Sequence, residues 1–167
     1  MVILGIDPGL NRTGYGAIRA EGRRLQYLTA GDIRPPRHGT MGERLDHLHR
    51  ALSELLAAQQ PDTVVLEMVF THQDYASTAA LMAHARGMSV LAVQQHGIPL
   101  VEYPTARVKK AVTGRGAATK EQVARMVSQW VSASDPAWSS DATDALALAV
   151  AHAHMQPHAA LAARARR

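Results

Sequence analysis

The stretch from Val2 to Ile18, VILGIDPGLNRTGYGAI, contains the pattern that decides the fold. Val2 to Ile6 is a short apolar run with β-branched residues, and it ends at Asp7 and the turn residues Pro8-Gly9. An apolar run bounded by such a turn predicts a buried strand. Thr13 to Ile18 follows closely as a second strand, so the two are predicted to pair antiparallel. The sequence therefore places a carboxylate at the end of a buried strand.

The rest of the chain alternates between strand and helix patterns. Arg24 to Ile33 is predicted as a third strand, and residues 63–70 and 98–103 as two further strands. Two capping boxes, Thr40 with Glu43 and Thr119 with Gln122, each precede an apolar helical stripe. Three more helices are predicted to start near Tyr75, Thr105 and Asp141. This order predicts an α/β fold in which helices cover both faces of a mixed five-stranded sheet.

Length and composition favour one domain. The chain has 167 residues, 47% of them hydrophobic and 19% charged, which supplies enough apolar material for a core. We expect one domain over residues 1–156 and a basic tail over residues 157–167. The sequence has no cysteine, which excludes disulfides and thiolate metal sites, and it has no apolar run of the roughly 20 residues that a membrane helix needs. These features predict a cytoplasmic protein with no membrane partner. The net charge of +4 is only a weak indication of nucleic-acid binding.

Four acidic residues occupy positions where they can form a metal site. Asp7 and Glu67 stand near the ends of the two most apolar strands, and Asp141 and Asp144 share one face of a helical first turn. Mg²⁺ and Mn²⁺ prefer such oxygen ligands, and two ions about 4 Å apart can cut a phosphodiester. The helix pair also suits a helix N-terminus, and Asp7 can cap a turn, so each of these acids has a structural alternative. Glu67 is harder to explain structurally, because a buried unpaired carboxylate is costly.

Five motifs occur in the order typical of one enzyme family. They are LGIDPGLNRTGYG (4–16), VVLEMVF (64–70), ARG (85–87), GRGAATK (114–120) and DATDALALA (141–149). Together they resemble the RuvC family of bacterial Holliday junction resolvases over about residues 2–154. The resemblance implies a ribonuclease-H-like fold and a homodimer that makes paired symmetric nicks in four-way DNA junctions, in recombination and repair. It also implies Mg²⁺ as cofactor, with Mn²⁺ as a possible substitute and two ions in each site, and a branch-migration complex of the RuvA and RuvB type as partner.

The resemblance also assigns roles to individual residues. It places the metal ligands on the four acids, a junction-centre aromatic on Phe70, and the lysines of the catalytic and DNA-binding surface on Lys109 and Lys120. Arg115, in the glycine-rich loop 114–116, is interpreted as part of a clamp on the DNA backbone beside a capped helix N-terminus. The structural alternatives are a core role for Phe70 and solvated helix ends for the lysines. The implied catalytic set is Asp7, Glu67, Asp141, Asp144 and Lys120, and the implied DNA contacts are Phe70, Lys109, Arg115 and Lys120.

The segment 71–77, THQDYAS, departs from the family pattern, which commonly has a lysine-asparagine pair here. His72, Gln73 and Tyr75 are the candidates to replace the missing contacts. The helix that follows has a face of small residues, which packs either against a second copy of the chain or against its own sheet. These small residues are Ala76, Ala80, Ala83 and Gly87.

Three other functions share parts of this pattern. An actin-like or sugar-kinase-type ATPase also has an Asp-x-Gly turn after its first strand, but it needs two such domains, more than 167 residues supply. A non-catalytic junction-binding module would be favoured by loss of one of the four acids, and all four are present. A ribonuclease-H-like nuclease that acts on another nucleic acid is the remaining alternative.

Overall fold

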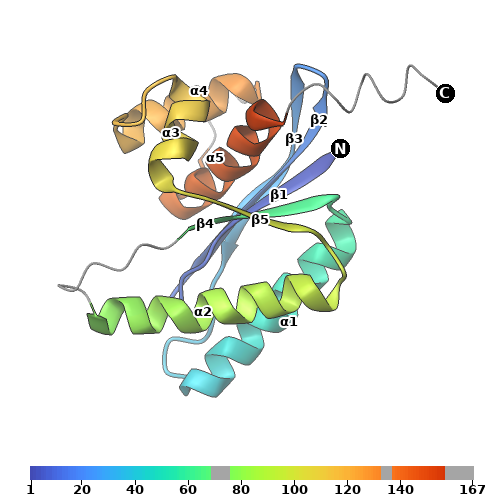
Figure 1. Cartoon of the computed structure of the whole chain (residues 1–167). Helices are drawn as coiled ribbons and strands as arrows, with labels where there is room; N and C mark the ends of the chain where they lie inside the picture. Colours follow the sequence, from blue (N-terminus) through green and yellow to red (C-terminus); the bar gives the residue numbers. More distant parts are fainter. Residues whose placement is uncertain (69–75, 133–136, 157–167) are drawn as a thin grey trace.

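A computed structural model of the chain describes residues 1–68, 76–132 and 137–156 (Figure 1). Phe70 and the segment 71–75 lie outside these residues, as does the predicted tail 157–167. The strands are β1 (Val2–Asp7), β2 (Thr13–Glu21), β3 (Arg24–Ile33), β4 (Thr63–Glu67) and β5 (Leu100–Tyr103). The helices are α1 (Met41–Gln59), α2 (Ala76–Gln95), α3 (Thr105–Thr113), α4 (Lys120–Trp130) and α5 (Ser140–Met155).

The sheet has the predicted mixed character. Its strand order is β3-β2-β1-β4-β5, with antiparallel pairing on the β3-β2-β1 side and parallel pairing from β1 through β4 to β5. The short connections allow the antiparallel hairpins, whereas the parallel pairs require the crossovers through α1 and α2. As a result, β1 and β4 end at the same edge of the sheet.

Helices cover both faces of this sheet, as predicted. In Figure 1, α1 and α2 lie on one side, while α3, α4 and α5 lie on the other. Neighbouring residues of β1 alternate between the two cores: Ile3 packs with the α3–α5 side and Leu4 with the α1–α2 side. A strand buried on both faces needs apolar residues at every position, which explains the continuous apolar runs of β1 and β4.

Helix α5 is the central helix of its face and packs unusually close to β1 and β2. A Cβ atom at Gly5 would overlap the carbonyl oxygen of Ala145, and one at Gly14 would overlap the carbonyl oxygen of Asp141. The glycines therefore let the helix backbone rest on the strand backbone. This close contact fixes the first turn of α5 at the edge of the sheet where β1 ends.

The boundaries of three elements differ from the predictions. Strand β4 ends at Glu67 rather than at residue 70, because its last register partner is Tyr103, the final residue of β5. Strand β5 starts at Leu100 rather than at residue 98, and β2 continues to Glu21 because β3 pairs with it up to the hairpin turn. Both predicted capping boxes are present at the starts of α1 and α4.

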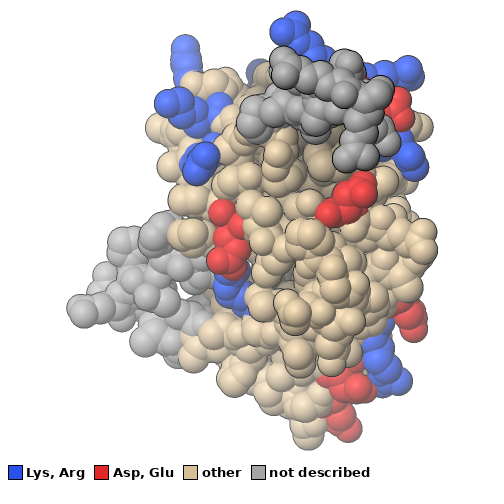
Figure 2. All heavy atoms as spheres, turned by 45° about the vertical axis from the view of Figure 1, so that its right-hand side comes forward, with Lys and Arg blue, Asp and Glu red and all other residues tan. Residues whose placement is uncertain are grey.

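Charged side chains do not form a broad basic surface on the face shown in Figure 2. Uncharged atoms cover most of what the described residues form there, and the Lys and Arg side chains stand in separate groups, mainly toward the upper end. None of the described helices is long and apolar enough to cross a membrane. On this face, the distribution of charge does not by itself mark a nucleic-acid site.

Candidate active site

Asp7 and Glu67 lie side by side at the carboxyl edge of the sheet. Ile6 and Leu66 are register partners in the parallel β1/β4 pair, so the two acids occupy the next row. Side chains alternate along a strand, and Ile3 and Val65 face the α3–α5 core, so both acids are directed toward the side of the sheet that α5 covers. The carboxyl ends of parallel strands are the usual location of binding sites in open α/β sheets.

The first turn of α5 brings the remaining two acids to this edge. Ser139 is the N-cap of α5, and its hydroxyl accepts a hydrogen bond from the Ala142 amide at 3.0 Å. The same hydroxyl donates to Asp32 Oδ1 at 2.5 Å, which ties the helix start to the end of β3. Burial raises the pKa of Asp32, but the hydrogen bond from Ser139 and the nearby arginines outweigh it, so the net pKa is lowered.

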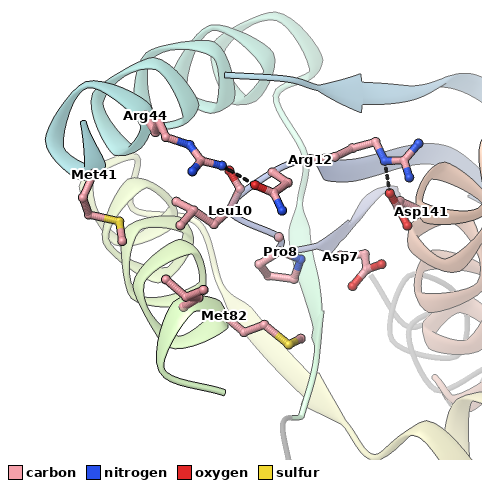
Figure 3. Close-up of a pocket in the computed structure, with 11 residues that line it drawn as sticks. Asp7, Pro8, Leu10, Arg12, Met41, Arg44, Met82 and Asp141 are labelled. Carbon is pink, nitrogen blue, oxygen red and sulfur yellow. Dashed lines mark hydrogen bonds and ion pairs between the residues drawn. The ribbon is translucent and has the colours of Figure 1, made fainter. Parts of the chain in front are cut away.

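A cavity of about 170 Å³ joins three of the four acids to both predicted lysines. Its polar lining consists of Asp7, Glu67, Asp144, Thr105, Lys109 and Lys120. A second hollow of about 440 Å³ lies on the other side of Asp7 and includes Asp141 (Figure 3). Asp7 is thus the acid common to both hollows, between Asp141 on one side and the remaining two acids on the other.

Three of the four carboxylates already have a partner within the chain. Lys120 Nζ donates to Asp144 Oδ2 at 3.1 Å, and this ion pair raises the pKa of Lys120. The Arg12 guanidinium pairs with Asp141, as the dashed line in Figure 3 shows. The Thr105 hydroxyl donates to Glu67 Oε1.

Asp7, by contrast, is surrounded by negative charge. Burial, followed by repulsion from Asp144, Glu67 and Asp141, raises its pKa from 3.8 to about 7, against the opposing effect of Lys120. The four acids therefore interact electrostatically although they come from three separate elements. A shift of this size in a cleft is typical of a functional site.

The donor set fits a hard divalent cation, although the ligands are not drawn together. Among the described residues, no three carboxylate or imidazole groups converge closely enough to coordinate one ion as they stand. The other three carboxylates are each directed to a partner of their own, namely Arg12, Lys120 or Thr105. Asp7 and the three carboxylates around it supply the oxygen ligands that Mg²⁺ or Mn²⁺ prefers, and a cation there would offset the repulsion that adds to the effect of burial on the pKa of Asp7.

Comparison with known proteins decides the family. The family described as crossover junction endodeoxyribonuclease RuvC matches residues 3–152 of the chain. The chain belongs to the RuvC family. A crossover junction endodeoxyribonuclease RuvC from Azorhizobium caulinodans is 45% identical over 159 residues, which cover 95% of this chain and 93% of that protein.

Solved structures agree with this assignment. A Thermus thermophilus RuvC in complex with a Holliday junction substrate has a TM-score of 0.86 and 30% identity, covering 92% of this chain and 93% of that one. The yeast mitochondrial Holliday junction resolvase Ydc2 has a TM-score of 0.65 at 11% identity, covering 91% of this chain and 77% of that one, and so shares the fold. The predicted ribonuclease-H-like fold and the predicted family are confirmed.

The structure brings most of the predicted site residues to one edge of the sheet, on either side of Asp7. Asp7, Glu67, Asp144, Lys109 and Lys120 line one cavity. Asp141 reaches the same edge on the other side of Asp7. Arg115 is exposed in the loop after α3 and does not line that cavity, and Phe70 lies outside the described residues.

Sequence reasoning missed four residues that contact the site. Arg12 pairs with Asp141, and the Thr105 hydroxyl donates to Glu67. Asp32 acts through Ser139, the N-cap of α5, and Arg86 Nη1 donates to the main-chain oxygen of Glu67 at 2.7 Å. Arg86 also pairs with Glu102 on β5, so it fixes the end of β4 from the neighbouring strand. The ARG motif was a signal for Arg86, whereas Arg12 and Asp32 gained their role only through the tertiary fold.

Proposed function

We propose that this protein is a divalent-metal-dependent endonuclease that resolves four-way DNA junctions by paired symmetric nicks. The observation that supports this most directly is the cavity in which Asp7, Glu67 and Asp144 face Lys109 and Lys120. Carboxylates bind metal ions and lysines bind phosphate, so this lining suits phosphodiester hydrolysis. Membership of the RuvC family supplies the junction as the substrate.

The acids and lysines have separate roles in this proposal. Asp7, Glu67, Asp141 and Asp144 would hold Mg²⁺ or Mn²⁺, with two ions in each site. Bound there, divalent ions supply an activated water and stabilise charge on the leaving oxygen. Lys120 stays protonated beside Asp144, so its ammonium group would stabilise negative charge on the reacting phosphate. Lys109 lines the same cavity and would contact the DNA.

A homodimer would match the two-fold symmetry of the junction, because each active site then meets one of two equivalent strands. Helix α2 supports this part of the proposal. Its small residues Ala80, Ala83 and Gly87 are exposed rather than packed on the sheet, and Leu91, on the same side, is 53% exposed. Such an apolar stripe on a helix surface suits contact with a second copy.

Further parts of the proposal come from the family alone. Phe70 would wedge against unstacked bases at the junction centre, and Arg115 would contact the DNA backbone. His72, Gln73 and Tyr75 would contribute contacts where the lysine-asparagine pair is absent. A RuvA- and RuvB-type complex would deliver the junction in the cytoplasm.

The proposal is tested with a synthetic four-way junction and a duplex of matched sequence, each with and without Mg²⁺. Both strands of like polarity are labelled so that paired nicks are seen. We expect symmetric nicks in the junction only, and only with metal. Equal cutting of the duplex or of an RNA–DNA hybrid would favour a less selective ribonuclease-H-like nuclease, and binding without cutting would favour a binding module.

A further inference from the structure

An arginine-lined hollow adjoins the carboxylate site. It has a volume of about 520 Å³ and is formed by the loop between β1 and β2, the loop after β3 and the first turn of α1. Its lining consists of Asn11, Arg12, Arg34, Pro35, Arg37 and Arg44. Three segments separated in the sequence thus bring four guanidinium groups around one space, which creates a local positive potential.

The arginine hollow is continuous with the acidic site. The neighbouring 440 Å³ hollow contains Asp7 and Asp141, and it shares Asn11, Arg12 and Arg44 with the arginine hollow. Figure 3 shows Arg12 extended toward Asp141 and Arg44 extended toward the loop after β1. A DNA strand bound at Asp7 would therefore have these arginines beside it.

Positive charge in the hollow is only partly compensated. Arg34 lies 3.0 Å from Asp32 Oδ2, and Arg12 pairs with Asp141 and lies 3.9 Å from Asp32. Within the described residues, Arg37 and Arg44 form no ion pair, and neither Asp32 nor any other acid lines the hollow. The hollow therefore has an excess of positive charge.

Arg44 is held in place without having its hydrogen-bonding capacity used up. One terminal nitrogen donates to the Leu10 carbonyl at 3.0 Å and to the Asn11 side chain. Its buried Nε has no acceptor among the described residues. The contacts to Leu10 and Asn11 orient this guanidinium, and its other terminal nitrogen makes no hydrogen bond among the described residues and can donate to a ligand.

We propose that the arginine hollow binds a backbone phosphate of the DNA strand that enters the active site. The planar guanidinium fork matches phosphate oxygens, and several forks around one space favour an anion over a base. The lining contributed by the described residues contains no aromatic ring, so it offers no surface for base stacking. The inference rests on the proposed nuclease function and adds the path of the cleaved strand beyond the metal site.

The test compares two double substitutions that remove equal charge. Arg34→Gln with Arg37→Gln changes the hollow, and Arg23→Gln with Arg24→Gln changes two exposed arginines at the other end of β3. Binding of a labelled four-way junction is measured against salt concentration in an Asp7→Asn background. We expect the hollow variant to bind about 10- to 100-fold more weakly, with a salt slope smaller by about 1, since loss of one phosphate contact removes about 0.9. The control pair should keep the wild-type slope.

A second arm locates the contact on the DNA. Single phosphates near the cleavage position are replaced in turn by neutral methylphosphonates. We expect one phosphate position that distinguishes the two proteins. Neutralising it should weaken binding by the protein with Arg34 and Arg37 intact, and should have little further effect on binding by the hollow variant. If the two double variants bind junctions alike in the Asp7→Asn background while the wild-type protein binds and cuts them, the arginine-hollow inference is overturned and the proposed function stands. If the wild-type protein neither binds nor cuts a junction, both are overturned.

Discussion

Replacing Asp7 by Asn should stabilise the metal-free protein at neutral and higher pH while it abolishes cleavage. The acid is partly buried and repelled by Asp144, Glu67 and Asp141, so its charged form is unfavourable in the folded state. Asparagine has nearly the same shape and no charge to bury. The substitution should therefore remove the free-energy cost of burying a charged carboxylate among other acids. Active sites often lower the stability of a protein in this way.

The sign of the pH dependence follows from the two pKa values. Below pH 3.8 Asp7 is protonated in both states, so it contributes nothing. Between pH 3.8 and about 7 the folded state keeps the proton and the unfolded state loses it, so the free energy of unfolding falls as pH rises. Above about pH 7 Asp7 is ionised in both states, and the free energy of unfolding falls no further through this group. The variant lacks this titration.

The magnitude comes from the size of the shift. One pKa unit corresponds to about 1.4 kcal/mol, so a rise from 3.8 to about 7 corresponds to about 4 kcal/mol. We expect wild type and Asp7→Asn to be similarly stable near pH 4, and the variant to be more stable by up to about 4 kcal/mol at pH 8. Urea unfolding in EDTA at intervals from pH 4 to pH 8 measures the difference.

The control is Asp46→Asn, which removes an exposed acid that pairs with Arg50 one helical turn away. An exposed pair of this kind contributes less than about 1 kcal/mol, so this variant should be no more stable than wild type at pH 8. Adding Mg²⁺ should stabilise wild type and not Asp7→Asn, because only wild type then has the full ligand set. A stability difference that is the same at pH 4 and pH 8 would refute the electrostatic reasoning.

Three further predictions concern the surroundings of the site. Gly14→Ala should destabilise the fold by about 1–3 kcal/mol in urea unfolding and reduce cleavage in nicking assays, because the added Cβ would push the first turn of α5 away. The control Gly42→Ala has open space around the added Cβ and should change neither stability nor cleavage. Arg86→Gln should weaken Mn²⁺ binding, measured by electron paramagnetic resonance, because the end of β4 at Glu67 loses a charged donor; unchanged affinity would contradict this. Leu91→Arg should shift the protein toward monomer in sedimentation equilibrium and lower paired nicking, and an unchanged mass would argue against α2 as the interface.

Local patterns in the sequence determined most elements of the fold. The apolar runs of β1 and β4, the turn at Pro8-Gly9 and the capping boxes at Thr40 and Thr119 are each recognisable within a few residues. They report on backbone preferences and on burial, which depend mainly on neighbouring residues. The end of β4 was predicted wrongly because it depends on where the partner strand β5 stops.

The four acids could also be predicted from the sequence, because all four fall within motifs typical of the family and Glu67, inside an apolar strand, is hard to explain structurally. The electrostatic interaction between the four acids could not be predicted from the sequence. Whether Asp7 and Glu67 are neighbours depends on parallel pairing of β1 with β4, and the approach of Asp141 depends on α5 resting against Gly14. Only in the folded chain do carboxylates from three elements lie close enough to add to the effect of burial and raise the pKa of Asp7.

The tertiary structure alone decided which residues support the site. Arg12, Asp32 and Ser139 meet across long sequence separations, as do Arg86 and Glu67. The arginine hollow is likewise formed by two loops and the first turn of α1, which no local pattern connects. The sequence alone predicted the four acids as site residues of this RuvC family member. The fold decided how they repel one another and which basic groups surround them, because charge interactions depend on distance in space and not on distance along the chain.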